Sequence, residues 1–380
     1  MLYAGNGIRL SEGYGAFRKA VEKLGVPVVT CWDSIDAIED ENPLYVGRGG
    51  IMGDRAGNFA VQNADLVLAV GNRLSIRQVG YSWKTWAREA YVIMVDVDPA
   101  ELKKTTLHVE LPVCADAKDF FVQMNEQLVD EDVPVFSGTE WIGKCQEWKK
   151  NYPVTQTKHW EEDGKYANVY AFIKYLSQNL PQGNMTVVSN GSACVVGSHN
   201  YVIQKDSRFL INSAVASMGY GLPAAIGACI ANGKKDTICL EGDGSIMMNL
   251  QELQTDLTNK LPIKIFVINN QGYHSIRQTQ NNLFKEHCKI GIGPESGDLS
   301  FPDFAKLSQA FGYTYLEAHS NAQMKDMVDQ ALKIDGAVFC EIFVSAEQNF
   351  EPKSATKRLE DGTLVSPPLE DLAPFLPREE

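Results

Sequence analysis

The sequence predicts an α/β protein built from two doubly wound domains with parallel sheets. Apolar strands alternate with helical stretches in residues 1–130, and the same alternation returns in residues 166–346. In the second region, the strings Gly242-Asp243-Gly244-Ser245 and Asn269-Asn270-Gln271-Gly272-Tyr273 each follow an apolar run that favours a buried strand. Residues 249–259 between them carry leucines at helical spacing, so the unit predicts parallel neighbouring strands.

In the first domain, residues 13–24 have helical periodicity, with Phe17, Val21 and Leu24 on one face. Apolar runs then predict strands at 26–30, 65–71 and 91–96. This is a parallel nucleotide-binding pattern without the usual GxGxxG order. Strands that end in glycine are a weak signal, because many α/β domains have them.

The second domain starts at Tyr166 with a helix whose apolar residues recur at helical spacing. Its predicted strands are 186–189, 237–240, 263–268 and 338–344. Its predicted helices after the first are 249–259, 302–311 and 321–333. The carboxyl ends of the strands define the edge where open α/β sheets bind ligands.

The remaining segments predict a linker over 131–165 and a tail over 347–380. The linker is polar, and its tryptophans Trp141, Trp148 and Trp160 are interpreted as packing anchors rather than a binding surface. The tail contains five prolines, from which we expect no regular structure.

Composition excludes several classes of function. The net charge of −13 argues against extended nucleic-acid binding, and no apolar run is long enough to span a membrane. The start of the chain lacks the pattern of a signal peptide. The eight cysteines are scattered without a CxxC pair, which predicts reduced, mostly buried thiols in a cytoplasmic protein and makes a zinc site unexpected.

The two polar strings predict a site for a small hard cation. Asp243 and Asn270 follow neighbouring parallel strands, so their side chains can converge at one edge of the sheet. Carboxylate, amide and backbone carbonyl oxygens suit Mg²⁺ or Ca²⁺, with phosphate oxygens completing the coordination. Gly242 and Gly244 permit close approach of a diphosphate, and Ser245 lies at a helix start that favours anions. The alternative is an ordinary Gly-Asp turn and an Asn-rich strand end.

The spacing of GDG, a crossover and NN resembles the diphosphate-binding motif of thiamine diphosphate (ThDP) enzymes. The resemblance implies that Asp243, Asn270 and the carbonyl of Gly272 bind Mg²⁺. Tyr273, His274 and Ser275 match positions that hold the diphosphate by backbone contacts. His274 as an acid or base, and Arg277 and Gln280 near the substrate, remain open alternatives.

Two further segments resemble this family. The loop Asn190-Gly191-Ser192-Ala193 follows a strand where the family's first diphosphate loop is expected. Residues 212–227 resemble the segment that contacts the aminopyrimidine ring. By that match, the Ala216 carbonyl would accept a hydrogen bond from the 4′-amino group, and Met218 would hold the cofactor in its bent V conformation. A core methionine is the alternative for Met218.

The first domain resembles the middle domain of acetolactate synthase-like ThDP enzymes, which carries FAD. The positions that match are Gly5, Asn6, Gly7, Gly50, Met52, Gly71, Arg73, Arg77, Asp96 and Asp116. Arg73 and Arg77 could face the diphosphate, and Asp96 could accept from a ribose hydroxyl. Residues 47–49 and 54–55 depart from the family pattern, and an empty vestigial domain is the alternative.

The resemblance extends over essentially the whole chain, but only to the last two of the family's three domains. It implies decarboxylation of pyruvate or a related 2-oxo acid and transfer of the acyl unit to a carbonyl acceptor. The activating glutamate belongs to the absent N-terminal pyrimidine-binding domain, so we expect this chain alone to be inactive. That domain, in a longer protein or a separate chain, and a homo-oligomer are the expected partners. A tail that folds over the site is also expected. The alternative function is a non-catalytic flavin- or nucleotide-binding module, or a non-catalytic remnant of the enzyme.

Overall fold

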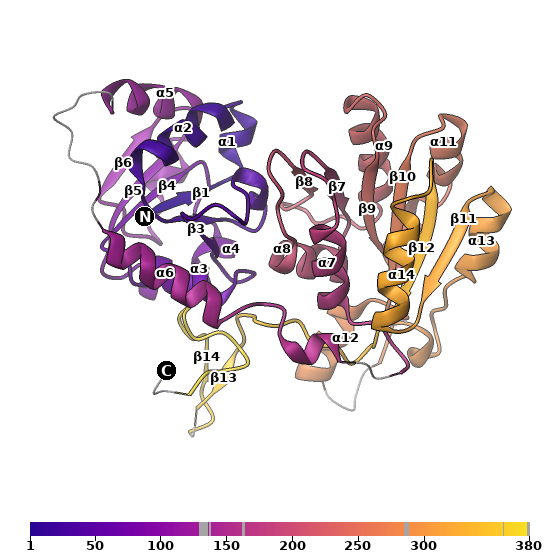
Figure 1. Ribbon diagram of the computed structural model, residues 1–380. Coiled ribbons are helices and arrows are strands. Elements are labelled where there is room, and N and C mark those ends of the chain that lie inside the picture. The colour runs from indigo at the N-terminus through magenta and orange to yellow at the C-terminus, as the bar shows by residue number, and fades with distance from the viewer. Residues whose placement is uncertain (129–135, 137, 162–163, 285–288, 360, 378–380) are drawn as a thin grey trace. The chain divides into compact units, whose positions relative to one another are not determined.

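The computed structural model describes residues 1–128, 136, 138–161, 164–284, 289–359 and 361–377. The chain divides into two compact units, which are described separately (Figure 1). The first unit comprises Met1–Val154 and Glu351–Glu380, and the second comprises Thr155–Phe350. Each unit contains a six-stranded sheet in which every strand pair is parallel. The predicted α/β class with two parallel sheets is therefore confirmed.

The sheet of the first unit has the strand order β3-β2-β1-β4-β5-β6. Its strands are β1 (Leu2–Ala4), β2 (Val28–Thr30), β3 (Tyr45–Arg48), β4 (Leu66–Val70), β5 (Tyr91–Asp96) and β6 (Leu111–Cys114). Neighbouring side chains on β1 point to opposite faces, so Tyr3 joins one apolar core while Leu2 and Ala4 join another. Both faces of this sheet are therefore buried.

Helices cover both faces of the first sheet. They are α1 (Gly7–Leu10), α2 (Tyr14–Leu24), α3 (Arg55–Gln62), α4 (Ile76–Val79), α5 (Ala117–Gln127) and α6 (Thr139–Asn151). The apolar face predicted for residues 13–24 is present in α2, where Phe17 packs edge-on against Phe121 at 5.5 Å between ring centroids. Gly25 ends this helix in a left-handed conformation with φ of 63°.

The sheet of the second unit has the order β11-β12-β10-β9-β7-β8. Its strands are β7 (Met185–Val188), β8 (Arg208–Ile211), β9 (Thr237–Gly242), β10 (Ile263–Asn269), β11 (Thr314–Ala318) and β12 (Val338–Phe343). Its helices are α7 (Val169–Gln178), α8 (Ser192–Asn200), α9 (Gly221–Ala231), α10 (Asp243–Ile246), α11 (Glu252–Thr258), α12 (His274–Leu283), α13 (Phe304–Phe311) and α14 (Asn321–Ala331). The predicted parallel pairing of β9 and β10 is confirmed, and Gly242 lies opposite Ile268.

Helix α6 lies in the segment that the sequence assigns to a linker, but it packs against the first unit. Trp141 and Trp148 meet edge-on at 5.6 Å, and both rest on the apolar core of that unit. Trp148 also contacts Phe59 on α3. Packing of these rings explains why the first unit extends to Val154.

The tail from Glu351 onward belongs to the first unit. Arg55 donates to the carbonyl of Leu372 at 3.1 Å and also to that of Pro374. The tail contains one short antiparallel pair, β13 (Lys357–Arg358) with β14 (Leu364–Val365), so the expectation of no regular structure was wrong at this point. These strands lie between the prolines, where nothing prevents pairing.

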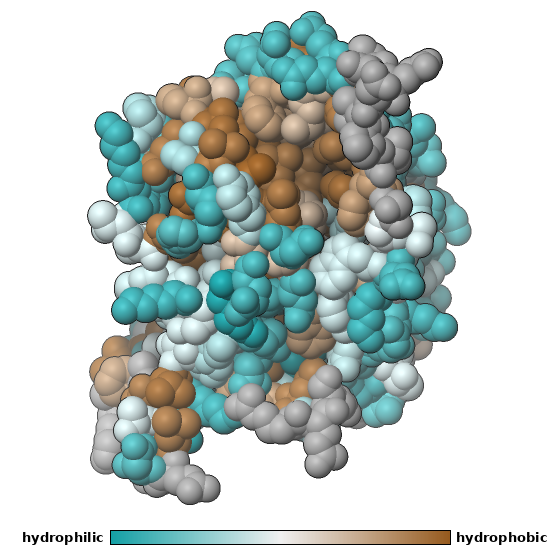
Figure 2. Space-filling model, turned by 90° about the vertical axis from the view of Figure 1, so that its left-hand side faces the viewer, coloured by the Kyte–Doolittle hydropathy of each residue, from teal (hydrophilic) through white to brown (hydrophobic). Residues whose placement is uncertain are grey.

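The surface around the edge strand β6 is partly apolar. Leu111 on β6 is 45% exposed, and Figure 2 shows apolar side chains gathered on the side of the molecule that bears this strand. Within the described part of the chain, no helix has the length and apolar character needed to cross a membrane. The seven cysteines described are free thiols, and all except Cys114 are buried.

Candidate functional site

The candidate site lies at the carboxyl edge of the second sheet. The chain leaves β7 toward β8 on one side and later returns to β9 on the other, so β7 and β9 flank a point where the strand order reverses. Open α/β sheets bind ligands at such a point. The turns after β7, β9 and β10 meet there in a pocket of about 120 Å³.

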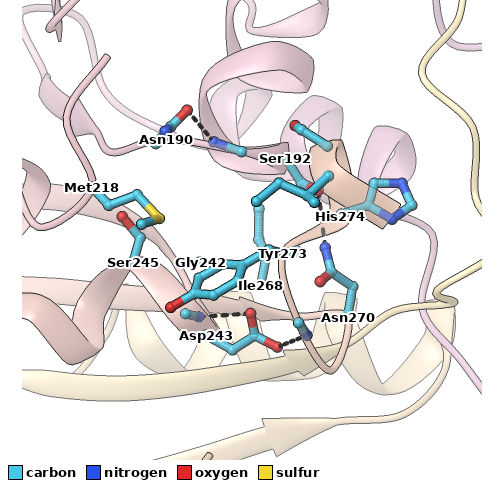
Figure 3. Close-up of a pocket in the computed structure, with 15 residues that line it drawn as sticks. Asn190, Ser192, Met218, Gly242, Asp243, Ser245, Ile268, Asn270, Tyr273 and His274 are labelled. Atoms are coloured by element: carbon cyan, nitrogen blue, oxygen red, sulfur yellow. Dashed lines mark hydrogen bonds between the residues drawn. The ribbon is translucent and has the colours of Figure 1, made fainter. Parts of the chain in front are cut away.

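Most residues predicted to contact ThDP line this pocket (Figure 3). The lining is Asn190, Gly191, Ser192, Met218, Gly242, Asp243, Gly244, Ser245, Ile268, Asn270, Gly272, Tyr273, His274, Ser275 and Ile276. Ala193 and Ala216 are not in the lining. Ile268 and Ile276 also line it, but they could not be selected from the sequence, because an isoleucine at a strand end or in a helix is usually a core residue.

Asp243 is the first residue of α10, directly after β9, and is only 2% exposed. One of its carboxylate oxygens accepts from the amide of Gly244 at 2.7 Å, and the other from the amide of Gly272 at 2.9 Å. Burial raises the pKa of Asp243 to about 7, although these amides and the charge of Arg277 oppose the rise. A carboxylate that is costly to ionise in isolation fits a position beside a cation.

The two asparagines at the end of β10, Asn269 within the strand and Asn270 directly after it, have different roles. Asn269 stabilises the turn: its Oδ1 accepts from the amide of Gln271 at 2.9 Å, and its Nδ2 donates to Glu341 at 2.6 Å. Asn270 turns toward the pocket, where its Nδ2 donates to Ser192 Oγ at 3.1 Å. The Oδ1 atom of Asn270 is buried and has no hydrogen-bond partner among the described residues.

This unpartnered oxygen is the observation that tests the metal site. A buried acceptor without a partner is costly, and a cation would satisfy it. Asp243 and Gly272 are joined by a hydrogen bond, so the three predicted ligands belong to one connected group. Hard oxygen donors of this kind fit Mg²⁺ or Ca²⁺.

Glycine at position 244 is required by the closeness of Tyr273. A Cβ added to Gly244 would lie 2.2 Å from Cε1 of the Tyr273 ring. Figure 3 shows this ring between Met218 and Asp243. By contrast, a Cβ on Gly242 would meet nothing nearer than 3.9 Å, so the first glycine of the motif is not needed for space in this structure.

Ser245 connects the turn after β9 with two other segments. Its Oγ lies 2.7 Å from Ser189 Oγ at the end of β7, and it accepts from the amide of Gly219 at 3.1 Å. Met218 precedes Gly219, is 39% exposed and points into the pocket (Figure 3). Its exposure does not fit the alternative of a core methionine.

Ala216 lies behind the pocket lining. Its carbonyl accepts from Asn190 Nδ2 at 2.8 Å, while Asn190 Oδ1 accepts from the amide of Gly191. Ala216 has φ of 53°, a left-handed conformation that costs energy for alanine and that this hydrogen bond helps to hold. A carbonyl oxygen has a second lone pair, so one bond to Asn190 leaves capacity for another donor.

Two charged residues support the site: Glu241, which sequence reasoning missed, and Arg277, which it considered only as a residue near the substrate. Glu241 on β9 is buried, and its Oε1 accepts from the amide of Leu222 at 2.8 Å at the start of α9. Burial raises the pKa of Glu241 to about 7. Arg277 is also buried and donates to backbone carbonyls of the turn after β10. The hypothesis that Arg277 approaches substrate does not fit this inward orientation.

His274 lines the pocket from the first turn of α12. Its Nε2 lies 2.6 Å from the carbonyl of Gln348, and its ring packs edge-on against Phe350. The residue is 5% exposed. These contacts hold the ring between α12 and the segment after β12.

In the first unit, the predicted FAD residues lie around the carboxyl edge of the sheet. Gly5, Asn6 and Gly7 follow β1, and Gly71 and Arg73 follow the adjacent β4, where this strand order also reverses. A Cβ on Gly5 would lie 2.2 Å from Asn72 Cα, so the two turns are packed backbone to backbone. The structure brings these five residues together.

The other predicted FAD residues have contacts within the protein. Asp116 caps α5 by accepting from the amides of Lys118 and Asp119, and Arg73 pairs with Glu101 at 2.5 Å. The Arg77 guanidinium lies 5.0 Å from the centre of the Trp32 ring. The backbone carbonyl of Arg77 is so close to Gly50 that a Cβ at position 50 would collide with it. Met52 packs on the core, and Asp96 ends β5, where it accepts from the amide of Asp98.

Comparison with protein families agrees with both units. The description "Thiamine pyrophosphate enzyme, central domain" matches residues 1–124, and "Thiamine pyrophosphate enzyme, C-terminal TPP binding domain" matches residues 189–342. The chain therefore contains the central and the C-terminal TPP-binding domains of thiamine pyrophosphate enzymes, as the resemblance in its motifs predicted.

The chain is also similar to acetolactate synthase large subunits. It is 30% identical over 355 residues to acetolactate synthase isozyme 2 large subunit of Escherichia coli K12, a match that covers 93% of the chain and 61% of that protein. It is 30% identical to the large subunit of Cyanidium caldarium and 29% identical to acetolactate synthase 1 of Zea mays, covering 59% and 54% of them. The chain thus spans about three fifths or less of these relatives. The matches do not favour a non-catalytic flavin- or nucleotide-binding module.

Proposed function

We propose that this chain supplies the central and diphosphate-binding parts of an acetolactate synthase-like carboligase that uses ThDP and Mg²⁺. The reaction is decarboxylation of pyruvate or a related 2-oxo acid, followed by transfer of the acyl unit to a carbonyl acceptor. The observation that carries the proposal is the buried, unpartnered Oδ1 of Asn270 beside the Asp243 carboxylate. Similarity to acetolactate synthase large subunits supports the reaction class.

Asp243, Asn270 Oδ1 and the Gly272 carbonyl would hold the cation, and the cation would hold the diphosphate. The backbone of residues 190–193 and 273–275 would contact phosphate oxygens, and Met218 would support the bent cofactor from the side. When bound, ThDP supplies a nucleophilic ring carbon and an electron sink for decarboxylation. This chain's residues would bind and orient it, while Ile268 and Ile276 would exclude water.

The proposal requires a partner for catalysis. The glutamate that activates the cofactor in this family would come from a pyrimidine-binding domain, in a longer protein or in another chain, and the tail would fold over the completed site. The chain alone is therefore expected to bind ThDP without turning over substrate. A homo-oligomer would bring such domains together.

The acceptor is proposed to be a carbonyl compound other than a second pyruvate, such as a keto-sugar. The loop Gly272-Tyr273-His274-Ser275-Ile276-Arg277 departs from the acetolactate synthase pattern where the pocket is lined. Efficient acetolactate formation from pyruvate alone by the assembled enzyme would contradict this part of the proposal. FAD binding by the ten residues of the first unit is a separate proposal.

Calorimetric titration of ThDP into the chain with Mg²⁺ tests the central proposal. Wild type is compared with Asp243→Ala and with Asp326→Ala, which changes an exposed aspartate on α14 of the same unit. We expect binding that requires Mg²⁺, is lost in Asp243→Ala and is unchanged in Asp326→Ala. Binding that survives Asp243→Ala, or no binding by wild type, would contradict a diphosphate site formed by this pocket.

A further inference from the structure

Arg277 makes an unusual set of contacts directly beneath the proposed metal loop, defined as residues 270–272. The residue is 2% exposed. Its Nη1 donates to the carbonyl of Asn270 at 3.1 Å, and its Nη2 donates to the carbonyl of Gln271 at 2.9 Å. Its Nε donates to the carboxylate of Glu295. One guanidinium therefore binds two consecutive carbonyls of the loop.

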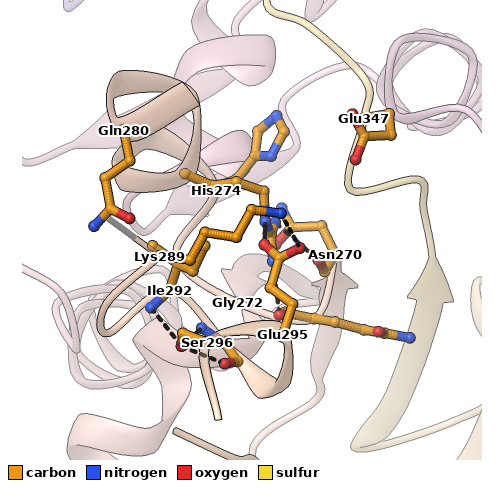
Figure 4. Close-up of polar contacts among 12 residues, drawn as sticks. Asn270, Gly272, His274, Gln280, Lys289, Ile292, Glu295, Ser296 and Glu347 are labelled. Atoms are coloured by element: carbon orange, nitrogen blue, oxygen red, sulfur yellow. Dashed lines mark hydrogen bonds and ion pairs between the residues drawn. The ribbon is translucent and has the colours of Figure 1, made fainter. Parts of the chain in front are cut away.

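Glu295 belongs to a backing loop, residues 289–298, that lies against the metal loop (Figure 4). The amide of Tyr273 donates to the carbonyl of Ile292 at 2.8 Å. Two hydrogen bonds join Gln280 on α12 to the backbone of Ile290, at 2.8 and 3.2 Å. Lys289 lies 3.7 Å from Glu295, so the carboxylate has a cation on each side.

The metal loop needs such support because its backbone is strained. Gln271 has φ of 57° and Gly272 has φ of 147°. A Cβ on Gly272 would lie 1.8 Å from the carbonyl oxygen of Ile292. A conformation of this kind persists only where surrounding contacts hold it. The contacts that hold it are the Arg277 fork, the backing loop and the Gly272–Asp243 hydrogen bond.

The Arg277 contacts determine which oxygens of the loop remain available. The backbone carbonyls of Asn270 and Gln271 accept from the guanidinium, while the Asn270 side-chain oxygen is left without a partner. The Glu295 carboxylate balances the buried positive charge beside Asp243. The arrangement therefore presets the loop before any cation arrives.

We propose that Arg277, held by Glu295, is a positioning residue that fixes the metal loop in the geometry required by Mg²⁺. This inference rests on the proposed function of the pocket. Mg²⁺ demands near-ideal octahedral geometry, whereas Ca²⁺ tolerates flexible coordination. A rigid fork to two carbonyls thus favours the smaller cation. Lysine cannot replace it, because an ammonium lacks the planar arrangement of donors.

The test measures cation affinity calorimetrically at saturating ThDP, first with Mg²⁺ and then with Ca²⁺. The variants of the full chain are Arg277→Met, Arg277→Lys and Glu295→Gln. The control is Lys306→Met, which changes an exposed lysine on α13 that pairs with Asp303. We expect Arg277→Met to weaken Mg²⁺ binding about 10- to 100-fold, as for other residues that orient metal ligands. Ca²⁺ binding should weaken less, and the control should match wild type.

Equal weakening for both cations, together with a lower unfolding midpoint, would overturn the proposal, since it would indicate a purely structural role. Unchanged Mg²⁺ affinity in Arg277→Met would also overturn it. If Glu295→Gln leaves Mg²⁺ affinity at the wild-type value, the part assigned to Glu295 is wrong.

Failure of wild type to bind Mg²⁺ and ThDP would count against the proposed function, and a second measurement keeps the two inferences separate. Hydrogen exchange of the Gly272 amide is followed in the chain without cation. Faster exchange in Arg277→Met than in Lys306→Met supports a preset loop. The same rate in both variants would overturn it.

Discussion

The two units present glycine-rich turns at the carboxyl edges of similar sheets, but their polar groups are satisfied in different ways. At the edge of the second unit, Asn270 has a buried oxygen without a partner among the described residues. At the edge of the first unit, Asp116 caps a helix and Arg73 pairs with Glu101. None of the ten predicted FAD residues, all within the described part of the chain, has a buried side-chain polar atom lacking a hydrogen bond.

The difference separates two kinds of evidence for a ligand site. A buried polar atom without a partner has an energetic cost that a ligand can remove, so it points to something that binds. The ten predicted FAD residues carry no such cost, and their resemblance to a nucleotide-binding domain is explained equally well by the packing of turns. The predictions below test this contrast, from the largest expected effect to the smallest.

Asn270→Ala should separate binding from stability. We expect the affinity for ThDP with Mg²⁺ to fall by about 100-fold or more, because a charge-assisted ligand contact is lost. The free energy of unfolding should change by less than about 1 kcal/mol, since only one hydrogen bond, to Ser192, is removed. Titration calorimetry and urea denaturation measure the two quantities. A large loss of stability with retained affinity would reverse the interpretation of this residue.

Asp256→Asn should change the pH dependence of stability in the second unit. Burial raises the pKa of Asp256 to about 6, and its Oδ1 has no partner among the described residues, while Tyr313 donates to its Oδ2. The folded state therefore keeps this proton to higher pH than the unfolded state, so the free energy of unfolding falls as pH rises from about 4 to about 6. Asp256→Asn should remove this pH dependence, which changes the free energy of unfolding by about 3 kcal/mol in total.

Asp54→Asn is the matched control in the first unit. Asp54 is also buried, but its oxygens accept from the amides of Arg48 at 2.8 Å and Gly57 at 2.6 Å. An asparagine NH₂ cannot accept, so this variant should be less stable than wild type, whereas Asp256→Asn should be more stable at pH 7. Denaturation curves between pH 4 and 7 compare them. If the stability of wild type and of Asp256→Asn changes with pH in the same way, the raised pKa assigned to Asp256 is wrong.

Gly5→Ala should destabilise the first unit by about 2 kcal/mol without any ligand, because its Cβ would meet the backbone of Asn72 and Gly71. Gly15→Ala is the control: a Cβ there meets nothing within 4 Å, and α2 should gain slightly from alanine. Tryptophan fluorescence follows this unit, since five of the six tryptophans lie within Met1–Val154. Equal stability of the two variants would argue that the glycine turn serves a ligand instead.

Asp116→Ala should cost about 1 kcal/mol, the usual effect of losing a helix cap. Asp116→Asn keeps a capping oxygen and should be nearly neutral. If the edge of the first unit binds FAD through this carboxylate, both variants will lose flavin affinity, measured by quenching of flavin fluorescence. Equal flavin affinity in wild type and both variants would leave the residue a cap only.

The sequence predicts the position of residues that directly follow a recognisable strand. Asp243 and Asn270 follow central strands, and their spacing alone places them on one edge of the sheet. Arg277 could not be oriented in this way, because its direction depends on Glu295, which comes from a separate loop. Edge strand β6 is short, contains Pro112 and is largely exposed, so its sequence lacks the apolar run that identified β5.

The assignment of segments to units depends on packing across long sequence distances. Helix α6 is polar in sequence, and contacts with distant residues, such as that of Trp148 with Phe59, show which unit it joins. The same holds for the tail, where Glu370 accepts from Gln62 at 2.5 Å and from Arg88 at 2.7 Å. Neither partnership leaves a periodic signal near the residue concerned. The expected placement of the tail over the active site stays a prediction.

The return of the tail to the first unit has a consequence for synthesis. The ribosome synthesises Thr155–Phe350 before it reaches Glu370 and Leu372. The first unit therefore cannot form its contacts with the tail until the whole second unit has been synthesised. Until then, Arg55 lacks the two tail carbonyls to which it donates. A nascent chain that has reached residue 350 would therefore hold a first unit without its tail contacts, and a chaperone could bind the surface that the tail later covers.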